Sequence, residues 1–507
     1  MSTRKRILEG SATSWLKIIL TFMTQLVLVP FYLSYWSAEI YGVWIGITSL
    51  LTLLQILDMG HHNFLEYEFY KLAGTDKVQF AQFLSSGLLI SILLGLLQLL
   101  LIYVLIEANF ISDIFKDVDR GLIEDAGSVL LIQGITWCVT GSPGGLLVRA
   151  LYSFGYLPRM GWWGIAFTIL TSVAPLLAVI QGAGLLEAGA ALAGATLFYY
   201  LMMFWDIKKQ LRKIALPFVR PSTGIGWINL YKSSVLSYKA VMELLRQQGV
   251  RLILAPMVGS KALVDFATMR TGANTMLQGL GTITNPMMPE LMKFLLARDQ
   301  KKVALTFSVV WLMLMLVLAP GALLLQAYVA PLFTIWTIGK IAFDPTVFGL
   351  LSMTVLVYAY AQPSISIVVG NNLLKPQFVI TTSSSVLLII LLLLFVPPVG
   401  IKGASAALLM VEIFVAIFYN HYAQIWLEGN SVKWPRSLAK MASFSVFITA
   451  VAFFIMHVAP GFKLMILFAS LVILLMNAIR YLKVAPIEMG AIIKNRGRKY
   501  FELLRGR

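Results

Sequence analysis

Long apolar stretches alternate with short polar segments along the whole chain. A helix needs about 20 predominantly apolar residues to cross a bilayer, and this criterion selects fourteen candidate spans. The seventh and eighth are weak by hydropathy and are included because of their length and position. The spans cover residues 10–34, 40–66, 80–106, 126–153, 161–182, 188–206, 228–257, 263–291, 303–328, 346–369, 377–396, 402–426, 441–459 and 463–482. The pattern predicts an all-α polytopic membrane protein with about 14 transmembrane helices.

The composition supports this fold class. Of the 507 residues, 59% are hydrophobic and 12% are charged, and a soluble protein of this length could not bury so much apolar surface. Cys138 is the single cysteine, which excludes an intrachain disulfide. The sequence has no Gly-rich phosphate loop or ATPase motif. We therefore expect no enzymatic activity, no catalytic residue, no metal site and no cofactor.

The basic residues predict the orientation. Most of the 40 Lys and Arg residues lie in loops on the same side as the N-terminus. The opposite loops and their edges hold only Lys116, Arg120, Lys261, Lys340, Lys402 and Lys463. Cytoplasmic loops attract Lys and Arg, so both termini are predicted to be cytoplasmic. This placement also accounts for the net charge of +17 without a nucleic-acid partner.

One outer loop, residues 107–125, differs from the others because it is acidic. It has six acidic and two basic residues. Two interpretations are open: a short amphipathic helix at the outer surface, or a solvated polar loop.

Charges are unusually dense in the segment Tyr231–Leu252. If this segment is an α-helix, Lys232, Lys239, Glu243 and Arg246 share a stripe about 60° wide. Charges within a membrane normally face the bundle interior or a watery cavity. The alternative is an amphipathic helix that lies on the membrane surface. A basic loop on one side and an outer turn on the other favour a membrane span with one face lining a cavity.

Polar side chains also recur at helical spacing in the first, second and eighth spans. In the second span, Asp58, His62 and Glu66 follow one another at i+4 steps and so share one helix face. Such stripes predict either hydrogen bonds between helices or the lining of a cavity. Arg149, at the end of the fourth span, is expected to snorkel to the cytoplasmic interface. The candidate cavity residues of the chain are Lys17, Gln25, Asp58, Glu66, Lys232, Lys239, Glu243, Arg246, Arg270 and Asn274.

A weak internal similarity relates spans 1–2 to spans 7–8. Pro30 precedes Tyr41-Gly42 by eleven residues, and Pro256 precedes Phe266-Ala267 by ten. Two parallel halves of six spans are a common transporter layout, with the substrate between them. The predicted organisation is a six-helix lobe (1–206), a basic cytoplasmic linker (207–227), a second six-helix lobe (228–426), two additional helices (441–482) and a basic cytoplasmic tail (483–507). The two lobes are expected to surround a central cavity.

The stretch "QLVLVPFYLSYWSAEIYGVWIGITSLLTLLQILDMG", residues 25–60, resembles the first two spans of bacterial polysaccharide and O-antigen flippases. These proteins belong to the multidrug/oligosaccharidyl-lipid/polysaccharide exporter superfamily. The matching residues are Pro30, Tyr35-Trp36, Tyr41 to Trp44 and Leu57 to Gly60. The following "HHNFLEYE" departs from the small residues expected there, which leaves the roles of His61 and His62 open.

The resemblance implies a function by alternating access. Proteins of this family move an undecaprenyl-pyrophosphate-linked oligosaccharide from the inner to the outer leaflet of the bacterial cytoplasmic (inner) membrane, for surface polysaccharides such as the O-antigen of lipopolysaccharide. The implied partners are the lipid-linked anionic oligosaccharide, a proton or sodium counter-ion, and the polymerase and other membrane proteins of glycan assembly. Lys17, Lys239, Arg246 and Arg270 are the expected head-group contacts. Asp58, Glu66 and Glu243 are candidates to carry a proton.

Three other functions compete with this one. A cation-coupled multidrug or small-molecule exporter of the same architecture would have a more acidic and more apolar cavity. A membrane-embedded polymerase or ligase would need large outer loops with catalytic groups, and most outer loops here are short. A scramblase-like partner protein is the third alternative.

Overall fold

The structure is a computed structural model that describes residues 3–486 apart from residues 74, 218, 297 and 372. Some side chains within helices, among them those of Gln25 and Lys239, lie outside the described set. The described part of the chain is helical and contains no strand, and twelve of its helical segments are long and apolar enough to cross a membrane. The predicted all-α polytopic fold is confirmed.

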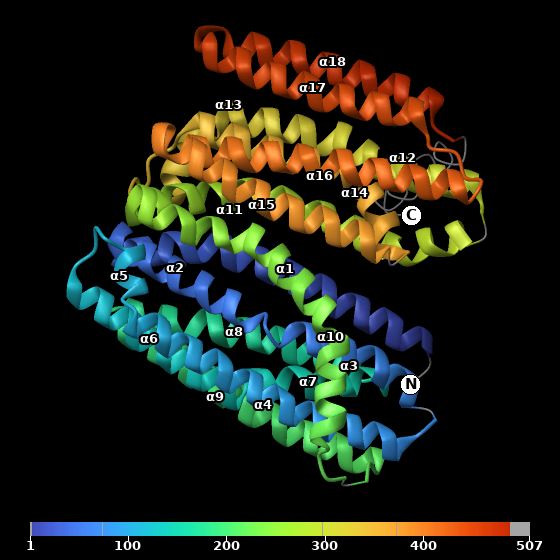
Figure 1. The fold of residues 1–507 in the computed structure, drawn as a ribbon. Helices are drawn as coiled ribbons and strands as arrows, with labels where there is room; N and C mark the ends of the chain where they lie inside the picture. The colour runs from blue at the N-terminus through green and yellow to red at the C-terminus, as the bar shows by residue number, and fades with distance from the viewer. Residues whose placement is uncertain (1–2, 74, 218, 297, 372, 487–507) are drawn as a thin grey trace, which may run out of the picture. The chain divides into compact units, whose positions relative to one another are not determined.

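The chain forms two compact units, Met1–Ala267 and Thr268–Arg507 (Figure 1). The first unit contains α1 (Thr3–Tyr35), α2 (Ala38–Gln55), α3 (Met59–Leu72), α4 (Lys77–Glu107), α5 (Phe110–Ile114), α6 (Arg120–Val139), α7 (Gly141–Ser153), α8 (Leu157–Ile180), α9 (Leu185–Ile214), α10 (Thr223–Leu244), the π-helical turn η1 (Leu245–Gly249) and the start of α11 (Val250–Leu296). The second unit contains the rest of α11, α12 (Gln300–Met313), the π-helical turn η2 (Leu314–Leu318), α13 (Ala319–Trp336), α14 (Pro345–Gly370), α15 (Leu374–Val399), α16 (Ile401–Gly429), α17 (Arg436–Val458), the short 3-10 turn η3 (Pro460–Phe462) and α18 (Lys463–Val484).

Two spans that the sequence predicts as continuous helices are broken. The second is interrupted at residues 56–58, between α2 and α3, and the fourth at Thr140, between α6 and α7. Thr140 has a non-helical backbone (φ −124°, ψ −64°). Pro143 accounts for this second break, because a proline ring in a helix clashes with the carbonyl four residues earlier, here that of Val139. The prediction of continuous helices is wrong at both places.

A third interruption lies within α11 at Gly259, between the seventh and eighth predicted spans. Gly259 has φ +82°, a conformation that glycine adopts without steric cost. The carboxylate of Asp117 accepts hydrogen bonds from the backbone N–H of Ser260 (3.0 Å) and from its hydroxyl (2.9 Å). Asp117 thus satisfies a backbone donor at the start of the helix that follows the break.

The acidic segment 107–125 packs onto the first unit. It forms the short helix α5, in which Ile111 and Ile114 are buried. Phe115, just after this helix, is also buried, and its ring lies against Gly46 of α2. The segment thus contains a short helix with a buried apolar side, as the first interpretation predicts. Its place at the outer surface stays a prediction.

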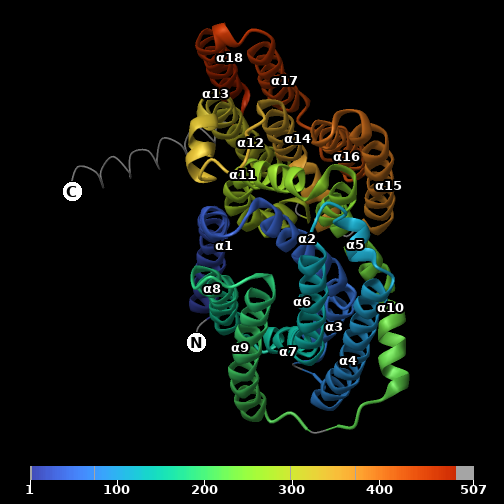
Figure 2. The same ribbon diagram turned by 90° about the vertical axis from the view of Figure 1, so that its left-hand side faces the viewer.

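Within each unit, neighbouring helices pack in pairs. In the first unit α8 contacts both α1 and α9, and α10 packs against α3 and α4 (Figure 2). In the second unit α16 contacts α14 and α15, and α17 pairs with α18. Asn477 of α18 donates hydrogen bonds to the carbonyl of Met441 (2.8 Å) and to the hydroxyl of Ser445 (2.8 Å), both on α17. The last two helices are thus joined by buried polar contacts as well as by apolar packing.

Candidate functional site

The two broken spans of the first unit meet at Asp58. This buried residue ends the interruption between α2 and α3 and precedes the first residue of α3. Its carboxylate accepts a hydrogen bond from the indole N–H of Trp137 (3.3 Å), which lies in the last turn of α6 before the second break. Interrupted membrane helices characteristically form the ion and substrate sites of transporters.

His62 lies one turn further along α3 and is fully buried. Its Nε2 is 2.9 Å from the hydroxyl of Ser91 on α4. Ser142, near the start of α7, donates a hydrogen bond to the backbone carbonyl of the same Ser91 (2.7 Å). His61 is also buried but lies against Gly87 of α4. Polar side chains therefore connect α3, α4 and α7 next to Asp58.

Arg149 of α7 completes the cluster. Its Nε is 3.3 Å from a carboxylate oxygen of Glu66, with 20% of the Arg149 side chain and 28% of the Glu66 side chain exposed. Its other nitrogens donate hydrogen bonds to the side-chain oxygen of Asn63 (3.0 Å) and to the carbonyl of Gly145 (3.1 Å). Arg149 therefore turns toward α3, and its reach to the cytoplasmic interface stays a prediction.

These groups border a pocket of about 280 Å³ within the first unit. The lining residues are Thr52, Gln55, Ile56, Asp58, Met59, His62, Trp137, Gly141, Gly145, Arg149, Tyr200 and Leu244. With Glu66 paired to Arg149, the cluster holds two carboxylates, one guanidinium and one imidazole. Ionisable groups at membrane depth are costly and normally functional, and this set can gain or lose a proton. In the described part of the chain, no group of three or more His, Cys, Asp or Glu could hold a metal ion.

The predicted stripe of α10 has a different setting. Lys232 and Glu243 are exposed, whereas Asn229 and Ser233 are buried where α10 packs on its neighbours. Lys239 lies outside the described side chains. The π-helical turn η1 begins at Leu245, so the register of an uninterrupted α-helix does not extend to Arg246, which is partly buried. The role of this stripe stays a prediction.

The remaining candidate residues are spread over both units. Lys17 of α1 is exposed, and its ammonium lies 3.6 Å from the position of a Cβ on Gly164 of α8. Gln25 lies outside the described side chains. Arg270 and Asn274 are partly buried on α11 in the second unit. The other eight candidates lie in the first unit. Among them, Asp58 lines the pocket and Glu66 pairs with Arg149, which also lines it.

The fold matches those of known transporters. An inward-facing multidrug resistance MATE family transporter of the MOP superfamily has a TM-score of 0.65 and 14% identity, over 82% of this chain and 95% of that chain. The lipid II flippase MurJ, in an inward closed conformation, has a TM-score of 0.64 and 14% identity, over 94% of this chain and 99% of that chain. The Vibrio cholerae MATE transporter VcmN has a TM-score of 0.57 and 13% identity, over 84% and 97%. The chain shares the fold of these three proteins. The sequence matches no protein-family model, and no curated protein matches it.

Sequence reasoning missed the partners that turn Asp58 and Glu66 into a cluster. Trp137 and Asn63 carry no distinctive spacing, and the direction of Arg149 depends on how α7 packs against α3. One signal was available. "TGSPGG", residues 140–145, places a proline and three glycines in the middle of an apolar span, which is the pattern expected of an interrupted helix beside a transport site.

Proposed function

We propose that the protein flips an undecaprenyl-pyrophosphate-linked oligosaccharide from the inner to the outer leaflet of the bacterial cytoplasmic membrane by alternating access, with both termini cytoplasmic. The observation that carries the proposal is the extent of the match to a lipid flippase. That match covers 94% of this chain, whereas the matches to the MATE transporters cover 82% and 84%. A flippase therefore accounts for more of the helices of this chain than a MATE transporter does.

The charges of the chain support an anionic, lipid-linked substrate. A pyrophosphate head group with sugars is hydrated and negatively charged, so it needs a wet, cationic route while its lipid tail stays in the bilayer. In this proposal Lys17, Lys232, Lys239, Arg246 and Arg270 contact the head group. Surface-polysaccharide assembly, with its polymerase and other membrane proteins, is the process that the protein serves.

The pocket at Asp58 supplies the coupling step in this proposal. Asp58 lines the pocket, and Glu66 lies beside it as the ion-pair partner of Arg149. Two carboxylates beside one guanidinium leave room for one added positive charge, a proton. Uptake of that charge changes the balance of the Arg149–Glu66 ion pair and of the Asp58–Trp137 hydrogen bond. Since these contacts join α3 to α6 and α7, the charge state of the pocket is linked to helix packing.

A cation-coupled exporter of small molecules is the second candidate function. It is favoured by the match to the MATE family transporter, whose TM-score of 0.65 is as high as the flippase's 0.64. The two candidates differ in the substrate and share the coupling pocket.

Depletion of the protein in its bacterial host distinguishes the candidates. We expect a lipid-linked oligosaccharide to accumulate with its sugar on the cytoplasmic side while the surface glycan disappears, and plasmid-borne protein to reverse both changes. Mass spectrometry identifies the accumulated lipid. An unchanged surface glycan together with increased sensitivity to cationic drugs would instead support the exporter.

A further inference from the structure

A groove runs along the first unit between α8 and α9. It has a volume of about 290 Å³. Its lining residues are Arg159, Trp163, Leu170, Phe198, Tyr199, Met202, Trp205 and Asp206. It shares none of the residues that line the pocket at Asp58. The groove is polar near the start of α8 and the end of α9, and apolar toward Leu170 and Phe198.

The polar end of the groove is held by one buried carboxylate. Asp206 accepts two hydrogen bonds from the guanidinium of Arg159 (2.7 and 2.6 Å) and one from the indole N–H of Trp163 (2.9 Å). The side-chain amide of Gln210 donates a fourth (3.1 Å). These contacts neutralise Asp206 and fix Arg159, half of whose side chain is exposed. The negative charge at this end is thus already matched.

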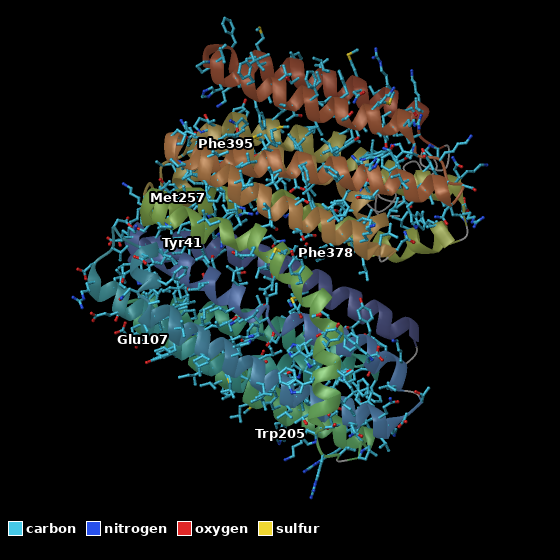
Figure 3. All side chains as sticks on the ribbon, viewed as in Figure 1. Tyr41, Glu107, Trp205, Met257, Phe378 and Phe395 are labelled. Carbon is cyan, nitrogen blue, oxygen red and sulfur yellow. The ribbon has the colours of Figure 1, made fainter. Side chains whose placement is uncertain are left out.

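Along one face of α9, the type of side chain changes toward the C-terminus of the helix. At 100° per residue, Phe198, Met202, Trp205, Lys209 and Arg212 lie within about 80° of the helix circumference. Phe198 is 55% and Trp205 is 70% exposed, and Trp205 lies at the edge of the unit (Figure 3). The ammonium of Lys209 lies over the Trp205 ring, 5.8 Å from its centroid. The order is apolar, aromatic and then cationic.

We propose that this groove binds an anionic glycerophospholipid of the surrounding membrane. One acyl chain lies along Leu170, Phe198 and Met202, and the phosphate lies at Lys209 and Arg212. Phe198 and Lys209 are eleven residues apart, about 16 Å along a helix, which matches one leaflet of a hydrocarbon core about 30 Å thick. Trp205 then lies at the depth that tryptophan favours, the boundary between hydrocarbon and head groups.

The size of the groove favours a phospholipid over the carrier lipid of the proposed substrate. A volume of about 290 Å³ is at the lower limit of small-ligand sites, which suits part of one acyl chain better than a long polyprenyl chain. The inference requires only that the chain lies in a membrane. It can therefore hold or fail separately from the proposed transport function.

Tryptophan quenching by brominated lipids tests the site. The purified full-length protein is placed in phosphatidylcholine nanodiscs that contain a small fraction of either brominated phosphatidylglycerol or brominated phosphatidylcholine. The quenching of Trp205 itself reports on the groove. It is the difference in quenching between the unmodified protein and the Trp205→Phe variant. We expect this difference to be several-fold larger with brominated phosphatidylglycerol.

Charge variants identify the phosphate contacts. Each basic residue near an anionic membrane surface contributes about fivefold to binding, so Lys209→Ala with Arg212→Ala should abolish the several-fold preference for phosphatidylglycerol. The matched control, Lys433→Ala with Lys440→Ala, removes two exposed cations of the second unit and should leave the preference unchanged. Equal quenching by both lipids, or an equal fall in the control, would overturn the proposal. A further outcome would also overturn the proposal: lipid-linked oligosaccharide displaces the brominated lipid, but unbrominated phosphatidylglycerol does not. The groove would then bind the proposed transport substrate.

Discussion

Arg149 and Glu66 face each other from α7 and α3 with most of both side chains shielded from solvent. Moving charges out of water is costly, and the attraction between two buried ions often does no more than offset that cost. Such a pair is therefore weak evidence for stability. It is better explained as a switch, because the neighbouring carboxylate of Asp58 and the imidazole of His62 give the cluster more than one charge state.

Neutralising Glu66 tests this role. Glu66→Gln keeps the side-chain size but removes the negative charge 3.3 Å from Nε of Arg149. We expect export to fall about tenfold or more at normal membrane abundance. Glu68→Gln is the matched control: Glu68 is two residues further along α3 and pairs with Lys71, whose side chain is 67% exposed. Since exposed pairs contribute about 0–1 kcal/mol, export by the control should be nearly unchanged. Equal export by both variants would exclude a coupling role for Glu66.

Arg246 tests the proposed head-group route. Reversing its charge should repel an anionic substrate, so Arg246→Glu is expected to reduce surface glycan about tenfold or more, with Arg246→Ala less severe. Lys433→Glu, a reversal at an exposed residue between α16 and α17, should have little effect. A surface-glycan assay beside an immunoblot separates transport from abundance. Full export by Arg246→Glu would reject the route and favour a surface helix.

Helical spacing alone was enough to predict which single residues share a helix face. The i+4 steps of Asp58, His62 and Glu66 predict a shared face, and in the structure His62 and Glu66 lie on α3, which Asp58 directly precedes. The partners of these residues were not predictable, because Trp137 and Arg149 come from α6 and α7, and only tertiary packing decides which faces of those helices meet α3.

At the scale of elements, the crossing of α3 and α10 fixes one wall of the pocket. Gly60 of α3 lies directly against Ser237 of α10, and a Cβ on Gly60 would overlap the Ser237 backbone. Leu244, the last residue of α10, lines the pocket. A side chain at Gly60 would therefore push apart the two helices that border the site.

Gly60→Ala should destabilise the first unit. Overpacking typically costs about 1–3 kcal/mol, and backbone atoms cannot move aside as a flexible side chain can. We expect a lower Tm of the purified protein and lower abundance in the membrane. Gly194→Ala on α9 is the control, because its Cβ would meet nothing within 4 Å. An unchanged Tm for Gly60→Ala would contradict the close crossing.

Hydropathy predicted where helices lie, but it did not predict where they break. Each of the fourteen predicted spans falls on helix, since length and apolar content decide this. The breaks at residues 56–58 and at Thr140 are short, so an average over the about 20 residues of a span passes over them. The turn at Gly259 was located because polar residues flank it.

At the scale of the whole molecule, the orientation in the membrane follows from the basic loops and stays a prediction. Cysteine labelling in intact cells checks it in a Cys138→Ser background. An impermeant thiol reagent should label Arg120→Cys, whose native side chain is 91% exposed at the start of α6. It should not label Lys208→Cys on α9 until the cells are opened. The reverse labelling pattern would place both termini outside.

Transport of the lipid-linked oligosaccharide is the central claim, and reconstitution tests it most directly. The purified protein is placed in liposomes that carry an undecaprenyl-pyrophosphate-linked oligosaccharide, and the sugar exposed on one leaflet is measured over time with an impermeant oxidant. We predict that the protein equilibrates or drives the sugar across the bilayer, and that Glu66→Gln slows this about tenfold relative to Glu68→Gln. Sugar that stays as inaccessible as in protein-free liposomes, while a small organic cation is transported, would contradict the flippase function.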